Sequence, residues 1–297
     1  MSKANPIFLG AGVAIVTPFN PDNTVNFAKL AALVNWQIEQ GTKAIIACGT
    51  TGESPVLTHD EHVEVIKTCI EAAGGRVPVI AGTGSNDTAY ALELSKEAEE
   101  LGADALLMVT PYYNKASQAG LIKHYTYIAD NVNIPIILYN VPSRTGCDIK
   151  PATYEALSHH KNITAIKEAN SNIAALADTI HLVEDRLCIY SGNDNEIVPL
   201  LSLGGHGVIS VISNILPYET NQMVELWHKG EVEKSRGLQI KLIDLCAVLF
   251  SDVNPIPVKA AMNLMGLNVG HCRMPLSEMS DEGLANLKKV MKAHNLI

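Results

Sequence analysis

The length, composition and charge of this chain favour one large α/β domain and exclude several classes of protein. The chain has 297 residues, of which 47% are hydrophobic and 18% charged, so it can bury a sizeable core. Its formal net charge of -9 argues against a broad affinity for nucleic acid or for anionic membranes. A small anionic substrate would therefore need a local basic residue inside a cleft.

Markers of membrane insertion, secretion or cysteine-based metal binding are not evident in the sequence. No apolar run approaches the roughly 18 residues that a transmembrane helix needs. Residues 1–6 lack the apolar stretch of a secretory signal, so we expect a cytoplasmic protein. The six cysteines lie far apart without a Cys-x-x-Cys pair, which indicates neither a zinc site nor a disulfide framework.

Eight short apolar runs, rich in β-branched residues, recur along the chain about 20 to 34 residues apart. Their near-continuous apolar character predicts the strands of a parallel sheet that is covered on both faces. The runs span residues 13–16, 44–47, 77–81, 105–109, 134–139, 163–166, 187–190 and 207–211.

Helical patterns separate these runs, with apolar residues every three or four positions over 27–38 and 91–101, for example. Residues typical of helix starts and helix ends accompany these patterns. Thr58 and Glu61 form a candidate capping box, and Gly102 lies where a C-terminal cap belongs. Eight alternations of strand and helix predict an α/β fold, a (β/α)8 TIM barrel.

A purely helical pattern follows the eighth strand. We expect the barrel to span residues 1–217, and a C-terminal helical appendage packed on the barrel to span 218–297. No linker of disordered composition separates the two regions. The helical segments lie near 218–229, 231–250, 256–265 and 280–294.

Lys167 is the most informative residue, because it stands at the end of the sixth apolar run, where a strand enters the protein interior. One interpretation is a lysine whose stem packs while its amine reaches water. The other is a partly buried, neutral amine that attacks a carbonyl and forms a Schiff base. In a barrel the chemistry lies at the C-terminal ends of the strands. Polar residues also follow other runs, at 49–53, 110–114, 139–146 and 191–194.

These polar segments each allow a structural and a functional interpretation. The glycine and threonine segment 49–53 suits either a tight turn or a cradle for a carboxylate. Tyr113 and Tyr139 are either core residues whose hydroxyl groups reach solvent or proton carriers in Schiff-base chemistry. Arg144 is either a surface charge or a clamp for a substrate carboxylate.

A metal site is a further candidate, at His59 and His62. These histidines lie three residues apart at the start of an expected helix, a spacing that can ligate a metal ion. No carboxylate-rich loop or third ligand is evident beside them in the sequence, so we predict no metal site.

The full set of motifs resembles the dihydrodipicolinate synthase (4-hydroxy-tetrahydrodipicolinate synthase) family, within the superfamily of pyruvate-dependent class I aldolases. Single motifs are shared across the superfamily, but the whole set in this order is specific to the family, and the resemblance spans nearly the whole chain. The motifs lie at 49–53, 111–114, 139–146, 166–169, 204–210 and 254–259.

The resemblance implies a lyase that condenses pyruvate with L-aspartate 4-semialdehyde in the diaminopimelate route to lysine, without a metal or organic cofactor. Lys167 would form the Schiff base with pyruvate. Thr50, Tyr113 and Tyr139 would relay protons, with Tyr113 entering the site of a neighbouring subunit in a homotetramer built as a dimer of dimers. The expected substrate-binding residues are Thr50 and Thr51 for the pyruvate carboxylate, Arg144 for the semialdehyde, and Gly192 and Ile209 for the inner wall.

N-acetylneuraminate lyase, or another pyruvate-dependent aldolase of the superfamily, is the alternative. That lyase resembles the chain at the lysine and tyrosine, but it typically has Gly-Ser-Thr-Gly-Glu at the first motif and lacks the Pro-Ser-Arg turn. Thr50 and Arg144 therefore favour the synthase.

The resemblance also implies an effector pocket for L-lysine at a dimer interface. The family pattern has a glutamate where this chain has Tyr90, and commonly an alanine where it has Pro55. We therefore expect weak or modified inhibition by lysine. The matching pocket residues are Ser54, Leu57, His59, His62, Asn86 and Tyr112.

Overall fold

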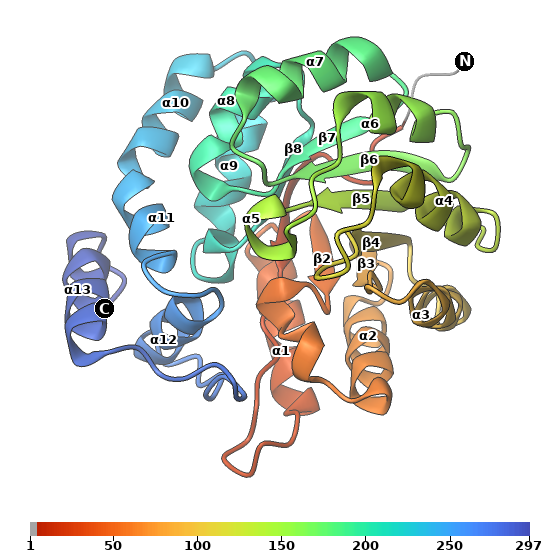
Figure 1. The fold of residues 1–297 in the computed structure, drawn as a ribbon. Helices are drawn as coiled ribbons and strands as arrows, with labels where there is room; N and C mark the ends of the chain where they lie inside the picture. The colour runs from red at the N-terminus through yellow and green to blue at the C-terminus, as the bar shows by residue number, and fades with distance from the viewer. Residues whose placement is uncertain (1–4) are drawn as a thin grey trace.

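The computed structural model describes residues 5–297, and it confirms the predicted (β/α)8 barrel. Eight parallel strands close into a barrel in chain order, from β1 beside β2 round to β8 beside β1, with helices around the outside (Figure 1). The expectation about a secretory signal rested partly on residues 1–4, which lie outside the described residues. No helix within 5–297 is long and apolar enough to cross a membrane.

The strands fall on or close to the predicted runs. The first is the exception, because it begins at Gly10, three residues before the predicted start. Glycine has a low propensity for strands, but here glycines let neighbouring strands approach closely. A Cβ atom on Gly207 would lie 2.0 Å from the carbonyl oxygen of Gly10. The strands are β1 (Gly10–Ala14), β2 (Ala44–Ala47), β3 (Val79–Gly82), β4 (Ala105–Val109), β5 (Ile136–Asn140), β6 (Ile163–Glu168), β7 (Cys188–Ser191) and β8 (Gly207–Ser210).

The helices of the barrel alternate with these strands, and the predicted capping box of Thr58 and Glu61 is present at the start of α2. Gly102 has a φ of 92°, as expected of a residue that follows a helix end. The helices up to β8 are α1 (Phe27–Glu39), α2 (His59–Ala73), α3 (Thr88–Glu100), α4 (Gln118–Ala129), α5 (Pro142–Thr145), α6 (Pro151–Leu157), α7 (Ile173–Val183) and α8 (Ile197–Ser202).

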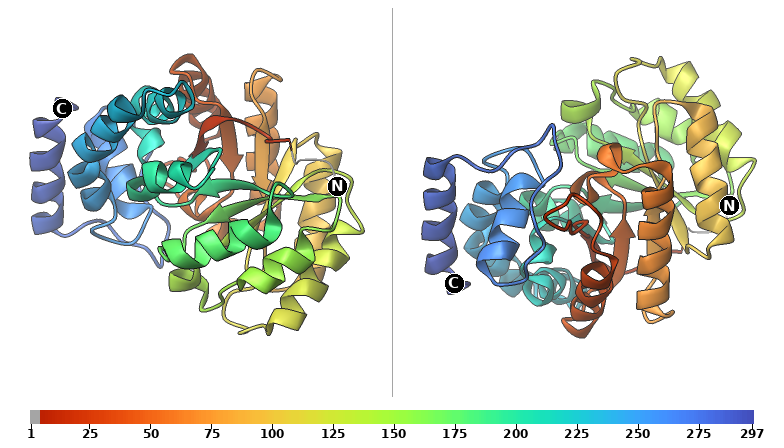
Figure 2. Two further views of the ribbon diagram at one scale, coloured as in Figure 1. Left: turned by 90° about the horizontal axis from the view of Figure 1, so that it is seen from above. Right: turned by 90° about the horizontal axis from the view of Figure 1, so that it is seen from below.

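The C-terminal helices stack along one side of the barrel, with α13 outermost (Figure 2). The predicted segment 231–250 is two helices, because the chain turns at Leu242, which caps the first and precedes the second. The first helix of the region packs on the barrel, where Ala11 of β1 donates its N–H to Asn221 Oδ1 at 3.1 Å. The division at residue 217 stays a prediction. These helices are α9 (Pro217–His228), α10 (Val232–Lys241), α11 (Ile243–Leu249), α12 (Ile256–Leu264) and α13 (Asp281–Ala293).

Two apolar cores result from strand alternation. One fills the barrel interior and includes Tyr139, Ala165 and Ile209; the other lies between the strands and the helices and includes Ile166. Ala165 points inward and Ile166 outward, so the alternation directs Lys167 into the barrel and Glu168 toward the helices.

Candidate active site

Lys167 and Tyr139 lie side by side at the C-terminal ends of β6 and β5, where they are register partners. Lys167 is 6% exposed, and its Nζ lies 4.1 Å from the centre of the Tyr139 ring. The face of a phenol ring attracts an ammonium group and holds it in one place. The amine therefore ends inside the barrel, against a hydroxyl-bearing ring, where a small carbonyl compound can reach it.

A pocket of about 170 Å³ opens above the two side chains and gathers most of the predicted site residues. Its size suits a small molecule of a few carbon atoms. Ile209 lies deeper, fully buried in the barrel interior. The predicted residues that line the pocket are Thr50, Thr51, Tyr139, Arg144, Lys167 and Gly192.

The predicted carboxylate cradle is a 3-10 turn, η1 (Thr50–Gly52), that follows β2. The buried Thr17 Oγ1 donates to the carbonyl oxygen of Gly52 at 2.6 Å, and Asn254 Nδ2 donates to Thr51 Oγ1 at 3.0 Å. The first N–H groups of such a turn have no acceptor within the turn itself. Together with the Thr50 hydroxyl, they form a surface that suits a carboxylate.

A buried ion pair fixes the far end of this turn. Glu53 has a φ of 55° and is 2% exposed, and its Oε1 accepts from Lys259 Nζ at 2.8 Å. Its Oε2 accepts from the Arg273 N–H at 2.8 Å. Lys259 also donates to the Thr17 carbonyl oxygen at 3.0 Å. The C-terminal region thus holds the cradle in place from behind.

Arg144 lies at the pocket rim on α5, a single helical turn that Gly146 ends at a φ of 68°. Its Nη2 donates to the Asn254 carbonyl oxygen at 3.5 Å. The guanidinium is exposed at the mouth, so its planar fork can meet an incoming carboxylate.

Tyr113 is the predicted site residue that the single chain does not bring to Lys167. Its side chain is 87% exposed and its backbone has a φ of 71°. The adjacent Tyr112, in contrast, lines a pocket within the chain.

Only some of the residues expected to bind the effector line the same pocket. A second pocket of about 420 Å³ adjoins the first through Thr50, Tyr139 and Arg144. His59 lies beside it, with its ring 5.9 Å from that of Tyr90, whereas Asn86 lines a separate, open pocket. The expected residues that do line the second pocket are Ser54, Leu57, His62 and Tyr112, together with Pro55 and Tyr90.

Asp194 is a buried carboxylate that the residue patterns did not single out. Its Oδ2 accepts the N–H groups of Val211 and Ile212 at 3.0 and 2.8 Å. Burial raises the pKa of Asp194, although these hydrogen bonds and the charge of Lys167 act in the opposite direction. Its position three residues after the end of β7, at the C-terminal end of a barrel strand, is the sequence feature that points to it.

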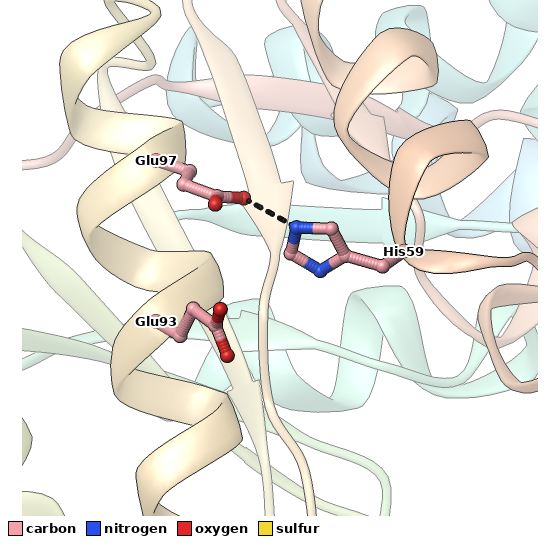
Figure 3. A group of neighbouring side chains, drawn as sticks. All are labelled: His59, Glu93 and Glu97. Atoms are coloured by element: carbon pink, nitrogen blue, oxygen red, sulfur yellow. Dashed lines mark ion pairs between the residues drawn. The ribbon is translucent and has the colours of Figure 1, made fainter.

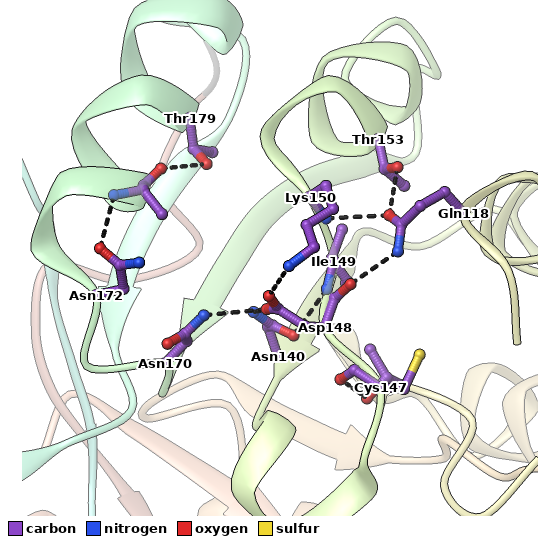
Figure 4. Close-up of polar contacts among 12 residues, drawn as sticks. Gln118, Asn140, Cys147, Asp148, Ile149, Lys150, Thr153, Asn170, Asn172 and Thr179 are labelled. Carbon is purple, nitrogen blue, oxygen red and sulfur yellow. Dashed lines mark hydrogen bonds and ion pairs between the residues drawn. The ribbon is translucent and has the colours of Figure 1, made fainter. Parts of the chain in front are cut away.

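A polar network lies behind the site, between the strands and the helices (Figure 4). Asn140 Nδ2 joins two carboxylates, with Asp148 Oδ1 at 2.9 Å and Glu168 Oε1 at 3.1 Å. Asn170 donates from Nδ2 to Asp148 and from its backbone N–H to Glu168. Burial raises the pKa of Glu168 to about 7. This network ties the ends of β5 and β6 together.

Comparison with known proteins places the chain within one family. The model of the Dihydrodipicolinate synthetase family matches residues 7–294. A 4-hydroxy-tetrahydrodipicolinate synthase of Lachnoclostridium phytofermentans is 55% identical over 292 residues, covering 98% of this chain and 99% of that protein.

Solved structures of synthases resemble the whole molecule. One is a chloride-inhibited dihydrodipicolinate synthase of Acinetobacter baumannii complexed with pyruvate, with a TM-score of 0.95, 42% identity, and coverage of 97% of this chain and 99% of that one. Another, from Cyanidioschyzon merolae with lysine bound, has a TM-score of 0.95 and 38% identity, and covers 99% of this chain and 100% of that one.

A closed parallel barrel that presents a lysine amine against a tyrosine ring at its strand ends has the architecture of a class I aldolase-type lyase, and the chain is an enzyme of this class. More particularly, the chain belongs to the dihydrodipicolinate synthetase family.

Proposed function

We propose that the chain catalyses the 4-hydroxy-tetrahydrodipicolinate synthase reaction, the condensation of pyruvate with L-aspartate 4-semialdehyde in the diaminopimelate route to lysine. The observation that carries this proposal is the buried contact of Lys167 with Tyr139 in a small pocket that also holds Thr51 and Arg144. An amine, a proton carrier and two groups for carboxylates are what this condensation requires.

The amine of Lys167 begins the reaction by adding to the carbonyl of pyruvate. Loss of water gives an imine, and loss of a methyl proton then gives an enamine, whose carbon forms a bond to the aldehyde carbon of the semialdehyde. The amino group of the semialdehyde next attacks the imine carbon, which closes the ring and releases Lys167. Each addition and elimination needs a proton transfer, which we assign to Tyr139, Thr50 and Tyr113.

The remaining pocket residues bind and orient the two substrates. The hydroxyl and N–H groups of Thr50 and Thr51 would bind the pyruvate carboxylate, as the turn geometry supports. Arg144 would bind the carboxylate of the semialdehyde at the mouth. Gly192 and Ile209 would form the inner wall.

Reduction with borohydride in the presence of pyruvate tests the proposal, because it converts the imine into a stable adduct. We expect peptide mapping by mass spectrometry to place the adduct on Lys167, and a Lys167→Arg variant to form none. Lys150→Arg is the matched control, since Lys150 lies in the network on the other side of β6 and pairs with Asp148, and trapping should persist there. Trapping retained in Lys167→Arg contradicts the assignment of the nucleophile.

Assembly and location belong to the same proposal. We propose a cytoplasmic homotetramer in which Tyr113 completes the site of a neighbouring subunit, which its exposure supports. None of the six cysteines, which all lie within residues 5–297, forms a disulfide, as is usual where thiols stay reduced. N-acetylneuraminate lyase activity is not favoured, because Thr50 and Arg144 both line the pocket.

A further inference from the structure

Helix α3 supplies the carboxylates that the sequence did not place beside His59. Glu93 and Glu97 stand one turn apart on the same face of α3 and point toward His59, the first residue of α2 (Figure 3). One ligand atom from each of the three side chains lies within 4.8 Å of the other two. Within residues 5–297 this is the one group of histidine, cysteine and acidic side chains with such a spacing.

The two closest side chains of the group, His59 and Glu97, are already as far apart as two ligands of one metal ion. His59 Nε2 lies 3.2 Å from Glu97 Oε2. Tetrahedral zinc, with ligands at about 2.0–2.1 Å, holds neighbouring ligand atoms roughly 3.3 Å apart. Glu93 is exposed, so its carboxylate can rotate to complete the third position.

Glu97 adds an independent observation. Its Oε2 is closed off from solvent, yet it accepts no hydrogen bond from any residue in the described part of the chain. The contact with His59 brings the two atoms together without hydrogen-bond geometry. The Glu97 side chain as a whole is 34% exposed, so the unmet acceptor is this one oxygen, and a cation between the two atoms would satisfy it.

The supports of these ligands are rigid. The capping box of Thr58 and Glu61 fixes the start of α2, where His59 stands. Leu94 and Ala98, next to the two glutamates, are buried and fix the rotation of α3. Ligands on rigid helices need little reorganisation on binding.

We propose that His59, Glu93 and Glu97 form a binding site for a divalent transition-metal cation of the zinc type, with water in the fourth position. One imidazole and two carboxylates suit Zn²⁺ or Co²⁺, whereas Mg²⁺ and Ca²⁺ prefer oxygen ligands alone. The site lies beside the pocket of about 420 Å³, because the His59 ring contacts Tyr90 of its lining. It is separate from Lys167, and it does not depend on the proposed function.

Calorimetric titration of the untagged protein with Zn²⁺, and the visible absorption spectrum with Co²⁺, test the site. We expect micromolar binding of one equivalent per chain, and a Co²⁺ spectrum of low coordination number without a thiolate band. His59→Gln, Glu93→Gln and Glu97→Gln should each weaken binding by at least about tenfold, since loss of a ligand costs no less than loss of its supporting partner.

His159→Gln is the matched control. His159 Nε2 lies 2.8 Å from Glu155 Oε1, so it also pairs with a glutamate, here through a hydrogen bond, but no third ligand of the described residues joins it. Cys272→Ser controls for the partly exposed thiol. Both variants should bind Zn²⁺ as the parent does. Absence of saturable binding in the parent, or equal binding in Glu97→Gln and the parent, overturns the proposal.

Discussion

Lys167 and Glu168 are neighbours in β6, but strand alternation gives them different environments. Lys167 enters the barrel and contacts Tyr139, whereas Glu168 points outward and accepts hydrogen bonds from Asn140, Tyr154 and Asn170. The outward carboxylate is buried within this polar network, and burial raises its pKa to about 7. Its charge state therefore changes near neutral pH, one residue away from the proposed nucleophile.

Glu168→Gln should change how stability depends on pH. A folded-state pKa above the unfolded value of 4.5 means that the folded protein binds the proton more tightly. The resulting stabilisation is complete below about pH 4.5 and is lost as the pH rises through about 7, a difference of roughly 3 kcal/mol at most. Thermal midpoints at pH 5 and pH 8 measure it.

The variant, which stays neutral, should gain stability relative to the parent between these two pH values. Glu71→Gln is the control, because Glu71 is exposed. A difference between Glu168→Gln and the parent that is the same at pH 5 and pH 8 contradicts the effect of burial.

Tyr90 bears, at the same scale, on the expected response to lysine. It lines the second pocket at the position where the family pattern has a glutamate, so a bound lysine ammonium would lack that carboxylate partner. We expect weak inhibition by L-lysine in a steady-state assay, and stronger inhibition of Tyr90→Glu. Tyr127→Glu is the control, since Tyr127 lies in the separate open pocket. Inhibition of the parent at low micromolar lysine contradicts the prediction.

At the scale of elements, the site depends on contacts between segments far apart in the chain. Glu53 and Lys259 are 206 residues apart, yet their buried ion pair joins the turn after β2 to α12. Burial lowers the pKa of Lys259, and the charge of Glu53 opposes this effect. The pair therefore matters more as a support of the carboxylate cradle than as a source of stability.

Lys259→Met should destabilise the protein strongly, because it leaves the Glu53 carboxylate buried without its cation. Breaking such a pair costs about 3–5 kcal/mol, whereas removing an exposed one costs roughly 0–1 kcal/mol. Thermal midpoints at one protein concentration should fall far more than in the control Lys229→Met, whose ion pair with Glu225 is exposed. The double variant Glu53→Gln, Lys259→Met should recover part of the loss. Equal effects of Lys259→Met and the control contradict this account.

Local sequence patterns predicted the elements better than the contacts between them. The strands at 44–47 and 105–109 have the predicted bounds, because a parallel strand covered on both faces is a continuous apolar run. Periodicity did not reveal the break at Leu242, since the apolar pattern continues across it. Periodicity also did not place Glu93 and Glu97 beside His59, because the packing of the whole barrel determines which helix faces lie against each other.

At the scale of the whole molecule, a single chain leaves its proposed proton relay incomplete. Tyr113 is 87% exposed and holds a φ of 71°, a conformation that costs free energy for a bulky residue. A large aromatic side chain exposed to solvent is typical of a group that a partner covers. The exposure therefore supports a site that two subunits share.

Mixing two inactive variants tests the shared site. Tyr113→Phe chains keep Lys167 but cannot supply the phenol, whereas Lys167→Arg chains supply the phenol but have no nucleophile. Unfolding and refolding the two together forms hybrid dimers, in which one of the two sites has both groups. Random pairing makes half of the dimers hybrid, so about a quarter of the parent activity should return. The control is refolding each variant alone, which should restore nothing beyond its own residual activity. If the mixture is no more active than the average of the two variants, Tyr113 acts within its own chain, and its exposed position must change when substrate binds.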